Sequence, residues 1–174
     1  MFDGLIIIDM LNDFLLEGAP LYLPSGRLII NNIKKEIDYS RERNIPVIYV
    51  CDSHLENDLE FKVWPKHCIK NSFGSKVVDE LSPLDNDLII EKNRYSSFYN
   101  TDLDELLKKM DIKTINIAGI LTNVCVLYTV ADAHFRDYNI VVKKNCVATN
   151  DRELENFAFR QMKEIHNVDL VDEK

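Results

Sequence analysis

A cysteine stands at the junction of a strand-like run and a helix-like run, where a thiol can do chemistry. The run 114–118, TINIA, predicts a strand, and residues 126–135 have the spacing and composition of a helix. Cys125 directly precedes that helix, so its thiol would lie near the positive end of a helix dipole and its free N–H groups. Such a field lowers the pKa of a thiol and makes it a nucleophile. The alternative is a small cysteine buried in the core.

Two further polar residues stand where strand-like runs end. Asp9 follows the apolar run 5–8, and Lys92 ends the segment that begins with the apolar run 88–90. The carboxylate of Asp9 could take the thiol proton, and a lysine beside both groups favours carboxylate and thiolate. The alternatives are that Asp9 caps the next turn and that Lys92 is a solvated charge. The position of both residues at strand ends, like that of Cys125, favours the catalytic interpretation.

A cysteine nucleophile often uses a histidine as its base, but no histidine follows Cys125 at a strand end. His134 lies inside the helix predicted after Cys125, and His166 lies near the C-terminus. Both are interpreted as structural or surface residues. Asp9 is therefore the best candidate for the base.

A second group of residues has the composition of a metal site. Asp52 and His54 lie two apart on an extended segment, which points both side chains to one side, and His67 follows beside Trp64. One carboxylate and two imidazoles suit zinc, iron or manganese with open coordination positions. The alternative is a loop held by hydrogen bonds between Asp52 and His67. Glu60 is equally a fourth ligand or a solvated loop charge.

Apolar runs alternate with amphipathic stretches along the whole chain, and no linker or repeat interrupts them. Strands are predicted at 5–8, 47–50, 88–90, 114–118, 140–142 and 168–171, and helices at 28–43, 75–81, 103–110, 125–135 and 152–165. Continuous apolar strands separated by helices imply an α/β fold, with a mainly parallel sheet that is covered on both faces. Ligands of such sheets bind beyond the carboxyl ends of the strands. The polar residues named above fall at those ends.

Length and composition set further bounds. The 174 residues fit a single domain, 1–174, and the net charge of -8 argues against a nucleic-acid-binding protein. No apolar run approaches the roughly 20 residues that span a bilayer, and the N-terminus lacks the features of a signal peptide. The four cysteines form no CxxC pair, which is typical of reduced thiols. We therefore expect a cytoplasmic protein without a nucleic-acid or membrane partner.

Three segments of the chain resemble motifs of the isochorismatase-like cysteine hydrolases, which include nicotinamidases and N-carbamoylsarcosine amidases. Residues 8–14, IDMLNDF, resemble the opening motif D-x-Q-N-D-F, with Leu11 in place of the usual glutamine. Residues 92–98, KNRYSSF, resemble the lysine motif, and residues 119–126, GILTNVCV, resemble the nucleophile motif. The resemblance covers nearly the whole chain, and the order and spacing of the three motifs are specific to the family.

The resemblance implies a three-layer α/β/α sandwich with a Rossmann-like, six-stranded sheet. It implies a catalytic triad of Asp9, Lys92 and Cys125. It also implies a cis peptide bond between Ile120 and Leu121, with the backbone N–H groups of Leu121 and Cys125 forming an oxyanion hole. Members of the family commonly form homo-oligomers, so we expect a dimer or tetramer.

The motifs divide between two branches of the family. Asp52, His54 and His67 match the metal ligands of nicotinamidases, Glu60 lies where some of these enzymes have a carboxylate ligand, and Phe14 and Trp64 match the aromatic pair around the nicotinamide ring. Residues 92–96 and 122–125 are more similar to the N-carbamoylsarcosine amidase branch, because nicotinamidases usually have Thr-Asp at 122–123. True isochorismatases lack the nucleophilic cysteine, so Cys125 argues against their reaction.

The resemblance therefore predicts a cysteine-dependent amidohydrolase that releases ammonia from a small carboxamide through a thioester. The first hypothesis is a nicotinamidase-type enzyme that contains one divalent metal, zinc before iron or manganese, and no organic cofactor. The second is an amidase of a ureido or N-carbamoyl substrate that uses the same triad. The third is a non-catalytic family member that binds a small ligand.

Overall fold

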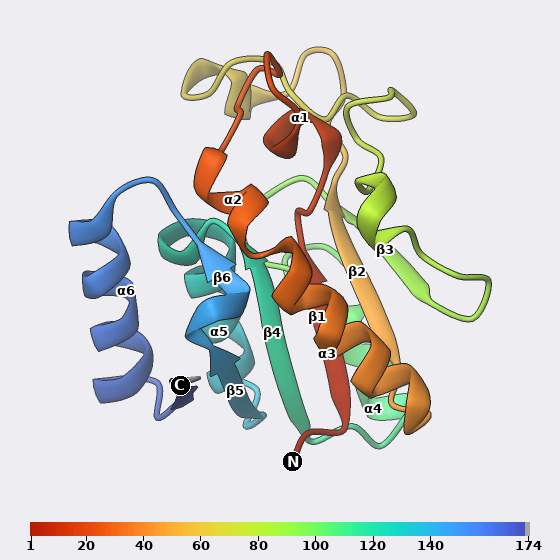
Figure 1. The fold of residues 1–174 in the computed structure, drawn as a ribbon, viewed down its shortest axis with the longest axis vertical. Coiled ribbons are helices and arrows are strands. Elements are labelled where there is room, and N and C mark those ends of the chain that lie inside the picture. The colour runs from red at the N-terminus through yellow and green to blue at the C-terminus, as the bar shows by residue number, and fades with distance from the viewer. Residues whose placement is uncertain (173–174) are drawn as a thin grey trace.

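The structure is a computed structural model that describes residues 1–172. Its centre is a parallel sheet with the strand order β3-β2-β1-β4-β5-β7, and a further short strand, β6, pairs with β4 (Figure 1). The strands are β1 (Gly4–Ile8), β2 (Val47–Asp52), β3 (Leu88–Lys92), β4 (Thr114–Ile120), β5 (Asn139–Lys143), β6 (Val147–Ala148) and β7 (Asp169–Val171). The six predicted strands form the continuous row. The prediction missed β6, because two residues carry no periodic signal.

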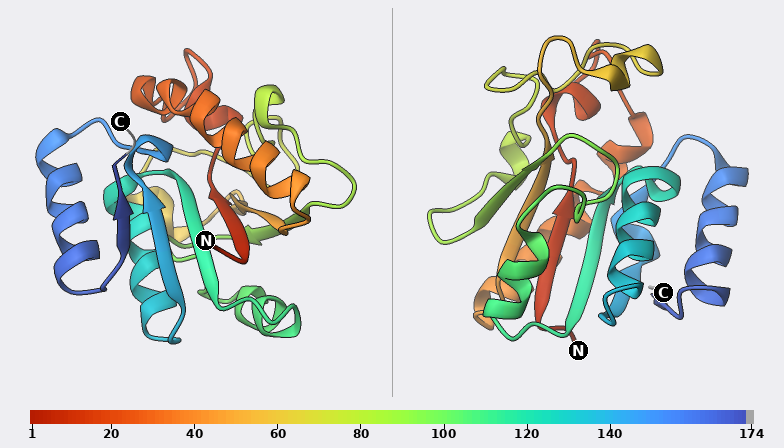
Figure 2. Two further views of the ribbon diagram at one scale, coloured as in Figure 1. Left: turned by 60° about the horizontal axis from the view of Figure 1, so that its bottom comes forward. Right: turned by 180° about the vertical axis from the view of Figure 1, so that it is seen from behind.

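Helices cover both faces of the sheet, which confirms the three-layer α/β/α sandwich (Figure 2). They are α1 (Asn12–Leu15), α2 (Pro24–Leu28), α3 (Ile30–Glu42), α4 (Leu103–Lys109), α5 (Leu127–His134) and α6 (Arg152–Glu164). Side chains alternate between the faces of β1, so Leu5 and Ile7 pack with α3 whereas Ile6 and Ile8 pack with α4 and α5. Every residue of β1 is buried, which explains its continuous apolar sequence.

The helix predicted at 75–81 is wrong for most of its length. Only a short 3-10 turn, η2 (Asp79–Leu81), is helical. The backbone before it is extended because it pairs with the segment after β1: the N–H of Asn12 donates to the carbonyl of Lys76, and the N–H of Val78 donates to that of Met10. Apolar spacing alone does not reveal such long-range backbone pairing.

Two other predicted helices begin later than expected. The helix predicted from 28 begins at Ile30, after the separate turn of α2. The helix predicted from Cys125 begins at Leu127, because residues 122–126 form a wider π-helical turn, η3 (Thr122–Val126). Cys125 therefore lies within this turn and not in the first turn of a regular α-helix.

The register of the sheet aligns its polar ends. Ile8 of β1 is paired with Val50 of β2 on one side and with Gly119 of β4 on the other. Asp52 and Lys92 are register partners at the ends of β2 and β3. The residues that follow β1, β2, β3 and β4 consequently meet above the same edge of the sheet, as the sequence predicted.

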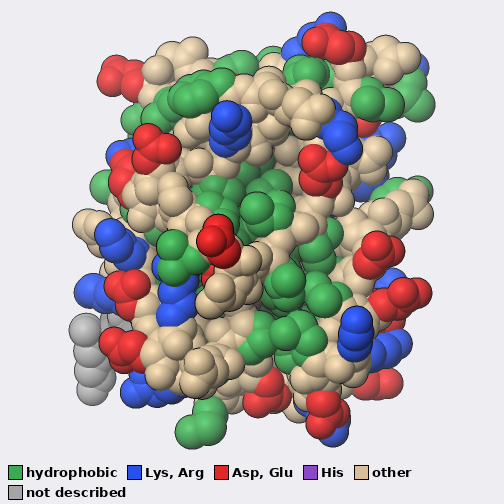
Figure 3. Space-filling view, turned by 90° about the vertical axis from the view of Figure 1, so that its right-hand side faces the viewer, with side chains coloured by type: hydrophobic (Ala, Val, Ile, Leu, Met, Phe, Trp, Pro, Cys, Tyr) green, Lys and Arg blue, Asp and Glu red, His purple; other side chains and the backbone are tan. Residues whose placement is uncertain are grey.

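The edge of the sheet at β3 is partly open to solvent. Ile89 in this strand is 60% exposed. In a view onto this side of the molecule, hydrophobic side chains gather in a shallow depression that charged side chains surround (Figure 3). Within residues 1–172, no helix is long and apolar enough to cross a membrane.

Candidate active site

A buried lysine joins three of the predicted site residues. The Lys92 ammonium lies 2.7 Å from Asp9 Oδ2 and 3.6 Å from Cys125 Sγ, and it also pairs with Asp52 Oδ1. All four side chains are buried. We call Asp9, Asp52, Lys92 and Cys125 the cysteine cluster. The structure thus brings the predicted triad together, and it adds Asp52, which the sequence placed only in the metal site.

Backbone hydrogen bonds of the sheet hold the acidic half of this cluster. Asp9 has a left-handed φ of 55° directly after β1, and its N–H donates to the carbonyl of Val50 at 3.0 Å. Its Oδ1 accepts a 2.9 Å hydrogen bond from the N–H of Asp52. The Asp9 carboxylate is therefore turned toward the end of β2 and toward Lys92.

The turn that carries the cysteine begins at a close contact between β4 and β1. Gly119 has a φ of 121°, and a Cβ at this position would lie 2.0 Å from the carbonyl oxygen of Ile8, so only glycine fits. A cis peptide bond joins Ile120 to Leu121, at the predicted position. The π-helical turn follows and places Cys125 beside Lys92.

The charges of the cluster oppose one another. Burial and the neighbouring Asp52 raise the pKa of Asp9 to about 6, although Lys92 counteracts them. Burial tends to raise the pKa of Asp52, but Lys92 and the two neighbouring histidines hold it below its usual range. One carboxyl of the pair is thus an ordinary anion, while the other can exchange a proton near neutral pH.

The expectation that the surroundings of Cys125 lower the pKa of its thiol is wrong. Burial raises the pKa of Cys125 well above its usual value, the two carboxylates raise it further, and Lys92 only partly offsets them. The regular helix begins at Leu127, so Cys125 does not stand at its first N–H groups as the sequence predicted. Burial therefore disfavours the thiolate, and Lys92 and the ionisable carboxyl of Asp9 lie beside the thiol.

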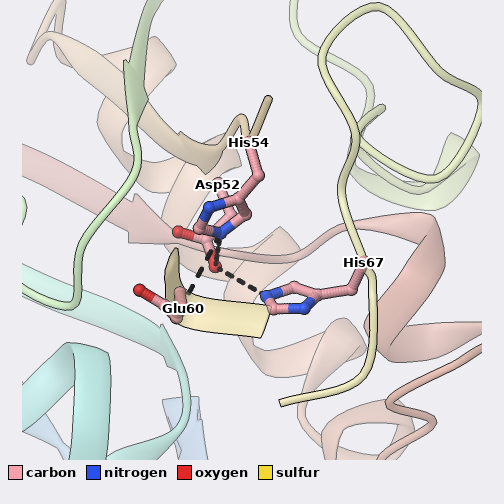
Figure 4. A group of neighbouring side chains, drawn as sticks. All are labelled: Asp52, His54, Glu60 and His67. Atoms are coloured by element: carbon pink, nitrogen blue, oxygen red, sulfur yellow. Dashed lines mark ion pairs between the residues drawn. The ribbon is translucent and has the colours of Figure 1, made fainter. Parts of the chain in front are cut away.

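The predicted metal ligands converge on one point (Figure 4). Ligand atoms of Asp52, His54, Glu60 and His67 all lie within 4.8 Å of one another, and all four residues are buried. Asp52 Oδ2 is 3.6 Å from His54 Nε2 and 3.7 Å from His67 Nε2, and Glu60 Oε1 is 3.9 Å from His54 Nε2. We call these four residues the imidazole–carboxylate group.

The imidazole–carboxylate group passes a test of its fit to a metal ion. His54 Nε2 is buried and has no hydrogen-bond partner within the described part of the chain, which is costly unless another ligand satisfies it. Two imidazoles with carboxylates form a donor set that suits zinc, iron or manganese. Glu60, which the sequence left as a ligand or a loop charge, points into the group (Figure 4).

Sequence reasoning missed Asp58. Its Oδ2 lies 3.1 Å from Nδ1 of His54, so it holds the side of the ring that faces away from the imidazole–carboxylate group. The only signal in the sequence is an acidic residue four positions after His54. In the structure this residue precedes the 3-10 turn η1 (Leu59–Lys62), and its side chain accepts a hydrogen bond from the N–H of Glu60. That pattern is common in loops and does not by itself identify a function.

A tight contact fixes the loop that returns His67 to the site. Asp13 Oδ2 accepts a 2.6 Å hydrogen bond from the N–H of Cys68, and the N–H of Asp13 donates to the carbonyl of Gly74 at 3.0 Å. A Cβ on Gly74 would lie 2.1 Å from the Asp13 carboxylate. Asp13, which belongs to the first motif, therefore positions the loop that carries the second histidine.

A cavity of about 430 Å³ opens above both groups. Cys125, Asp9, Asp52 and His67 lie at its polar end, and the predicted aromatic pair, Phe14 and Trp64, also lines it. The ring centroid of Phe14 is 5.5 Å from that of His67, and Trp64 Nε1 donates a 3.0 Å hydrogen bond to the hydroxyl of Tyr95. None of the described residues that line the cavity is a lysine or arginine, whereas Asp9, Asp52, Glu60 and Asp151 are acidic.

Comparison with known proteins places these features in one family. The family model described as Isochorismatase domain matches residues 3–171. Nicotinamidase/pyrazinamidase PncA from Bacillus subtilis has a similar structure, with a TM-score of 0.93, 31% identity and coverage of 98% of this chain and 100% of that chain. N-carbamoylsarcosine amidase from Thermoplasma acidophilum gives a TM-score of 0.89, 32% identity and coverage of 99% and 96%.

Two other matches bear on metal and on activity. The pyrazinamidase of Pyrococcus horikoshii in complex with zinc gives a TM-score of 0.91, 30% identity and coverage of 98% of both chains. A protein of Arabidopsis thaliana named probable inactive nicotinamidase is 31% identical, with coverage of 93% of this chain and 88% of its own. Similarity therefore does not choose between substrates, and the choice must come from the site.

Proposed function

Since this chain belongs to the isochorismatase family, we propose that it is a cysteine-dependent amidohydrolase that releases ammonia from a small neutral carboxamide, with nicotinamide as the model substrate. The observation that carries the proposal is Lys92, which contacts the acid, the thiol and Asp52 at the polar end of a cavity. If Cys125 only filled space in the core, a buried lysine between this thiol and two carboxylates would have no evident role.

In the proposed reaction, Asp9 accepts the proton of the Cys125 thiol while the sulfur attacks the amide carbonyl. The pKa of Asp9, about 6, suits a group that must take and return a proton near neutral pH. Lys92 stabilises the thiolate as it forms. The negative oxygen of the tetrahedral intermediate accepts hydrogen bonds from the backbone N–H groups of Leu121 and Cys125.

Collapse of the intermediate breaks the C–N bond. Asp9 returns the proton to the leaving nitrogen, so ammonia departs and a thioester to Cys125 remains. Asp9 then takes a proton from water, whose oxygen attacks the thioester. The C–S bond breaks, Asp9 returns the proton to the sulfur, and the carboxylic acid product leaves the free thiol behind and ionises in water. Asp52, His54, Glu60 and His67 would hold a divalent ion, zinc by preference, which when bound supplies a Lewis acid at the polar end of the cavity.

The second candidate is hydrolysis of a ureido or N-carbamoyl substrate. It is favoured by the Thr122-Asn123 pair and by the similarity to N-carbamoylsarcosine amidase. Substrates such as N-carbamoylsarcosine carry a carboxylate, and a buried carboxylate is costly without a cationic partner. Among the described residues, those that line the cavity offer several acids and no lysine or arginine, so the neutral carboxamide is the better fit.

The test is ammonia release by the zinc-loaded protein, with nicotinamide and N-carbamoylsarcosine assayed side by side. We expect release from nicotinamide. Release from N-carbamoylsarcosine alone would reject the argument from pocket charge and support the ureido branch. No release from either, or from a panel of other small amides, would favour a non-catalytic ligand-binding protein.

A further inference from the structure

The two histidines of the imidazole–carboxylate group are oriented by hydrogen bonds on their outer nitrogens. His54 Nδ1 lies 3.1 Å from Asp58 Oδ2, and His67 Nδ1 lies 2.7 Å from the main-chain carbonyl oxygen of Pro65. A carboxylate and a carbonyl only accept hydrogen bonds, and the Asp52 carboxylate lies beyond hydrogen-bond distance of both Nε2 atoms, at 3.6 and 3.7 Å. In each neutral ring Nδ1 therefore carries the hydrogen. The lone pair of each ring is then on Nε2, which faces Asp52.

Different kinds of hydrogen-bond partner hold the hydrogen on Nδ1 in the two rings. The partner of His67 is a backbone atom, which no side-chain substitution removes. The partner of His54 is a side chain, and the ring otherwise lies fully buried, 5.3 Å from the ring of Phe61 and 4.8 Å from that of His67 between centroids. The tautomer of His54 therefore depends on one side chain, Asp58, which can be replaced by mutation.

Asp58 is itself held firmly. Its Oδ1 accepts a 2.9 Å hydrogen bond from the N–H of Glu60, and Arg94 Nη1 lies 3.0 Å from Oδ1 and 3.3 Å from Oδ2. Only 6% of the side chain is exposed. Because Arg94 follows Lys92 by two residues, this contact also ties the segment after β3 to the loop that carries the metal-type ligands.

We propose that Asp58, held by Arg94, is a positioning residue that fixes the tautomer and orientation of His54 and thereby sets the affinity of the site for a divalent metal. The inference rests on the proposed metal site. Hydrogen-bond partners of metal-binding histidines typically change metal affinity by about 10–100-fold when they are replaced.

The isosteric variant Asp58→Asn gives the sharpest test. Oδ1 would keep its bonds from Glu60 and Arg94, so the new Nδ2 group would face His54 Nδ1 and donate to it. That contact favours the opposite tautomer, with the hydrogen on Nε2, where the metal should bind. A residue with a merely structural role would tolerate this change, because size and shape are retained.

The experiment measures zinc affinity by competition with a chromophoric chelator for the wild type, Asp58→Asn and Asp58→Ala. Glu56→Gln is the matched control, because Glu56 is an exposed carboxylate of the same loop that pairs only with Lys66 in the described structure. We expect Asp58→Ala to bind zinc about 10–100-fold more weakly, Asp58→Asn at least as weakly, and Glu56→Gln like the wild type.

A second readout does not depend on metal. Nitrogen-15 NMR of the metal-free protein should show Nδ1–H in His54 and His67 of the wild type. In Asp58→Asn the proton should move to Nε2 of His54 while His67, an internal control, stays unchanged. Should Asp58→Ala fail to fold, Asp58→Asn and Arg94→Gln take its place, the latter with a smaller loss of zinc affinity.

The outcomes separate this inference from the proposed metal site. A wild type that binds no zinc overturns both. A wild type that binds zinc tightly, with Asp58→Asn of equal affinity and unchanged His54 tautomer, overturns the positioning role and leaves the metal site standing. Weaker binding with an unchanged tautomer also rejects the mechanism, since the loss would then have another cause.

Discussion

The cysteine cluster and the imidazole–carboxylate group share Asp52, but different parts of the chain position them. Asp9, Asp52 and Lys92 lie at the ends of adjacent strands, where ladder hydrogen bonds fix the backbone. The histidines and Glu60 come from the connection between β2 and β3. Before His67 that connection contains a single 3-10 turn, η1, in the described structure. Hydrogen bonds from the side chains of Asp13 and Asp58 help to fix its path.

This difference has a consequence for mutagenesis. A residue at a strand end keeps its position when a neighbouring side chain changes, because hydrogen bonds to at least one adjacent strand hold its backbone. A loop residue loses its position when one supporting side chain is removed. The two groups should therefore respond to different substitutions, although they meet at one carboxylate.

Cys125→Ala should give the largest difference between the cysteine cluster and the imidazole–carboxylate group. Removal of the nucleophile should lower kcat/KM for amide hydrolysis by at least about 10³-fold, since the covalent step is lost. The zinc affinity and the thermal unfolding temperature should stay close to those of the wild type, because Cys125 is not a member of the imidazole–carboxylate group. Ammonia release, chelator competition and thermal unfolding measure the three quantities.

Cys51→Ala is a suitable control for this variant, because Cys51 is another buried thiol and lies in strand β2, next to Asp52 of the cysteine cluster. It should retain turnover. Equal loss in both variants would mean that the sheet, and not the nucleophile, had been damaged. Undiminished turnover in Cys125→Ala would end the covalent mechanism.

The next effect tests the sheet itself. In Gly119→Ala the new Cβ would lie 2.0 Å from the carbonyl oxygen of Ile8, at a φ of 121°. We expect a loss of about 3–5 kcal/mol in the free energy of unfolding, measured with urea, because β1 and β4 must move apart. Gly18→Ala is the control: it also has a positive φ, 83°, but nothing lies within 4 Å of its Cβ position. Its cost should be about 1 kcal/mol.

A small cost for Gly119→Ala, similar to that for Gly18→Ala, would mean that the two strands can separate without loss. The positions of Asp9 and Cys125 would then not be set by the sheet. The cysteine cluster would then depend on side-chain contacts in the same way as the imidazole–carboxylate group.

The part of the site that the sheet positions could be predicted from the sequence. Short runs of three to five largely apolar residues identify parallel strands, and the carboxyl ends of parallel strands must meet at one edge. Asp9, Asp52 and Lys92 were placed by that rule. The sequence did not reveal that Lys92 contacts Asp52 as well, because the direction of a long side chain depends on the charges around it.

The third effect concerns the loop. A Cβ on Gly74 would lie 2.1 Å from the Asp13 carboxylate, which accepts a hydrogen bond from the N–H beside His67. Gly74→Ala should therefore displace His67 and weaken zinc binding by about 10-fold, at a cost of about 1–2 kcal/mol in stability. The geometry of Asp9, Lys92 and Cys125 should be retained, so the labelling rate of Cys125 by a thiol reagent should change little.

Ser75→Ala, in the same loop, provides the control for Gly74→Ala. Its hydroxyl donates to the carbonyl of Ser72 and has no contact with Asp13 in the described structure. Normal zinc affinity in Gly74→Ala, or equal losses in both variants, would show that Asp13 does not position His67.

The loop contacts could not be predicted because they are formed by common residues at positions without a periodic signal. Asp13 was noticed only as a letter of a motif, and Asp58 was not noticed. Asp13 accepts a hydrogen bond from the N–H of Cys68, and Asp58 accepts one from Arg94. Both partners are distant in the sequence, so these bonds depend on the folded path of the loop. The residues 75–81 illustrate the same limit, since their pairing with residues 10–12 overrides the helical spacing.

The smallest effect distinguishes the wall of the cavity from its polar end. Trp64→Phe keeps an aromatic ring but removes the 3.0 Å hydrogen bond from Nε1 to the Tyr95 hydroxyl. A hydrogen bond of this kind contributes about 1 kcal/mol, so KM for the amide should rise about 5-fold while kcat stays nearly constant.

Tyr95→Phe removes the same bond from the other side and should have the same effect. Because the two residues share one interaction, the double variant should be little worse than either single variant. Strict additivity, or a fall in kcat in place of the rise in KM, would mean that the pair contributes to the chemistry itself and that wall and polar end are not separate.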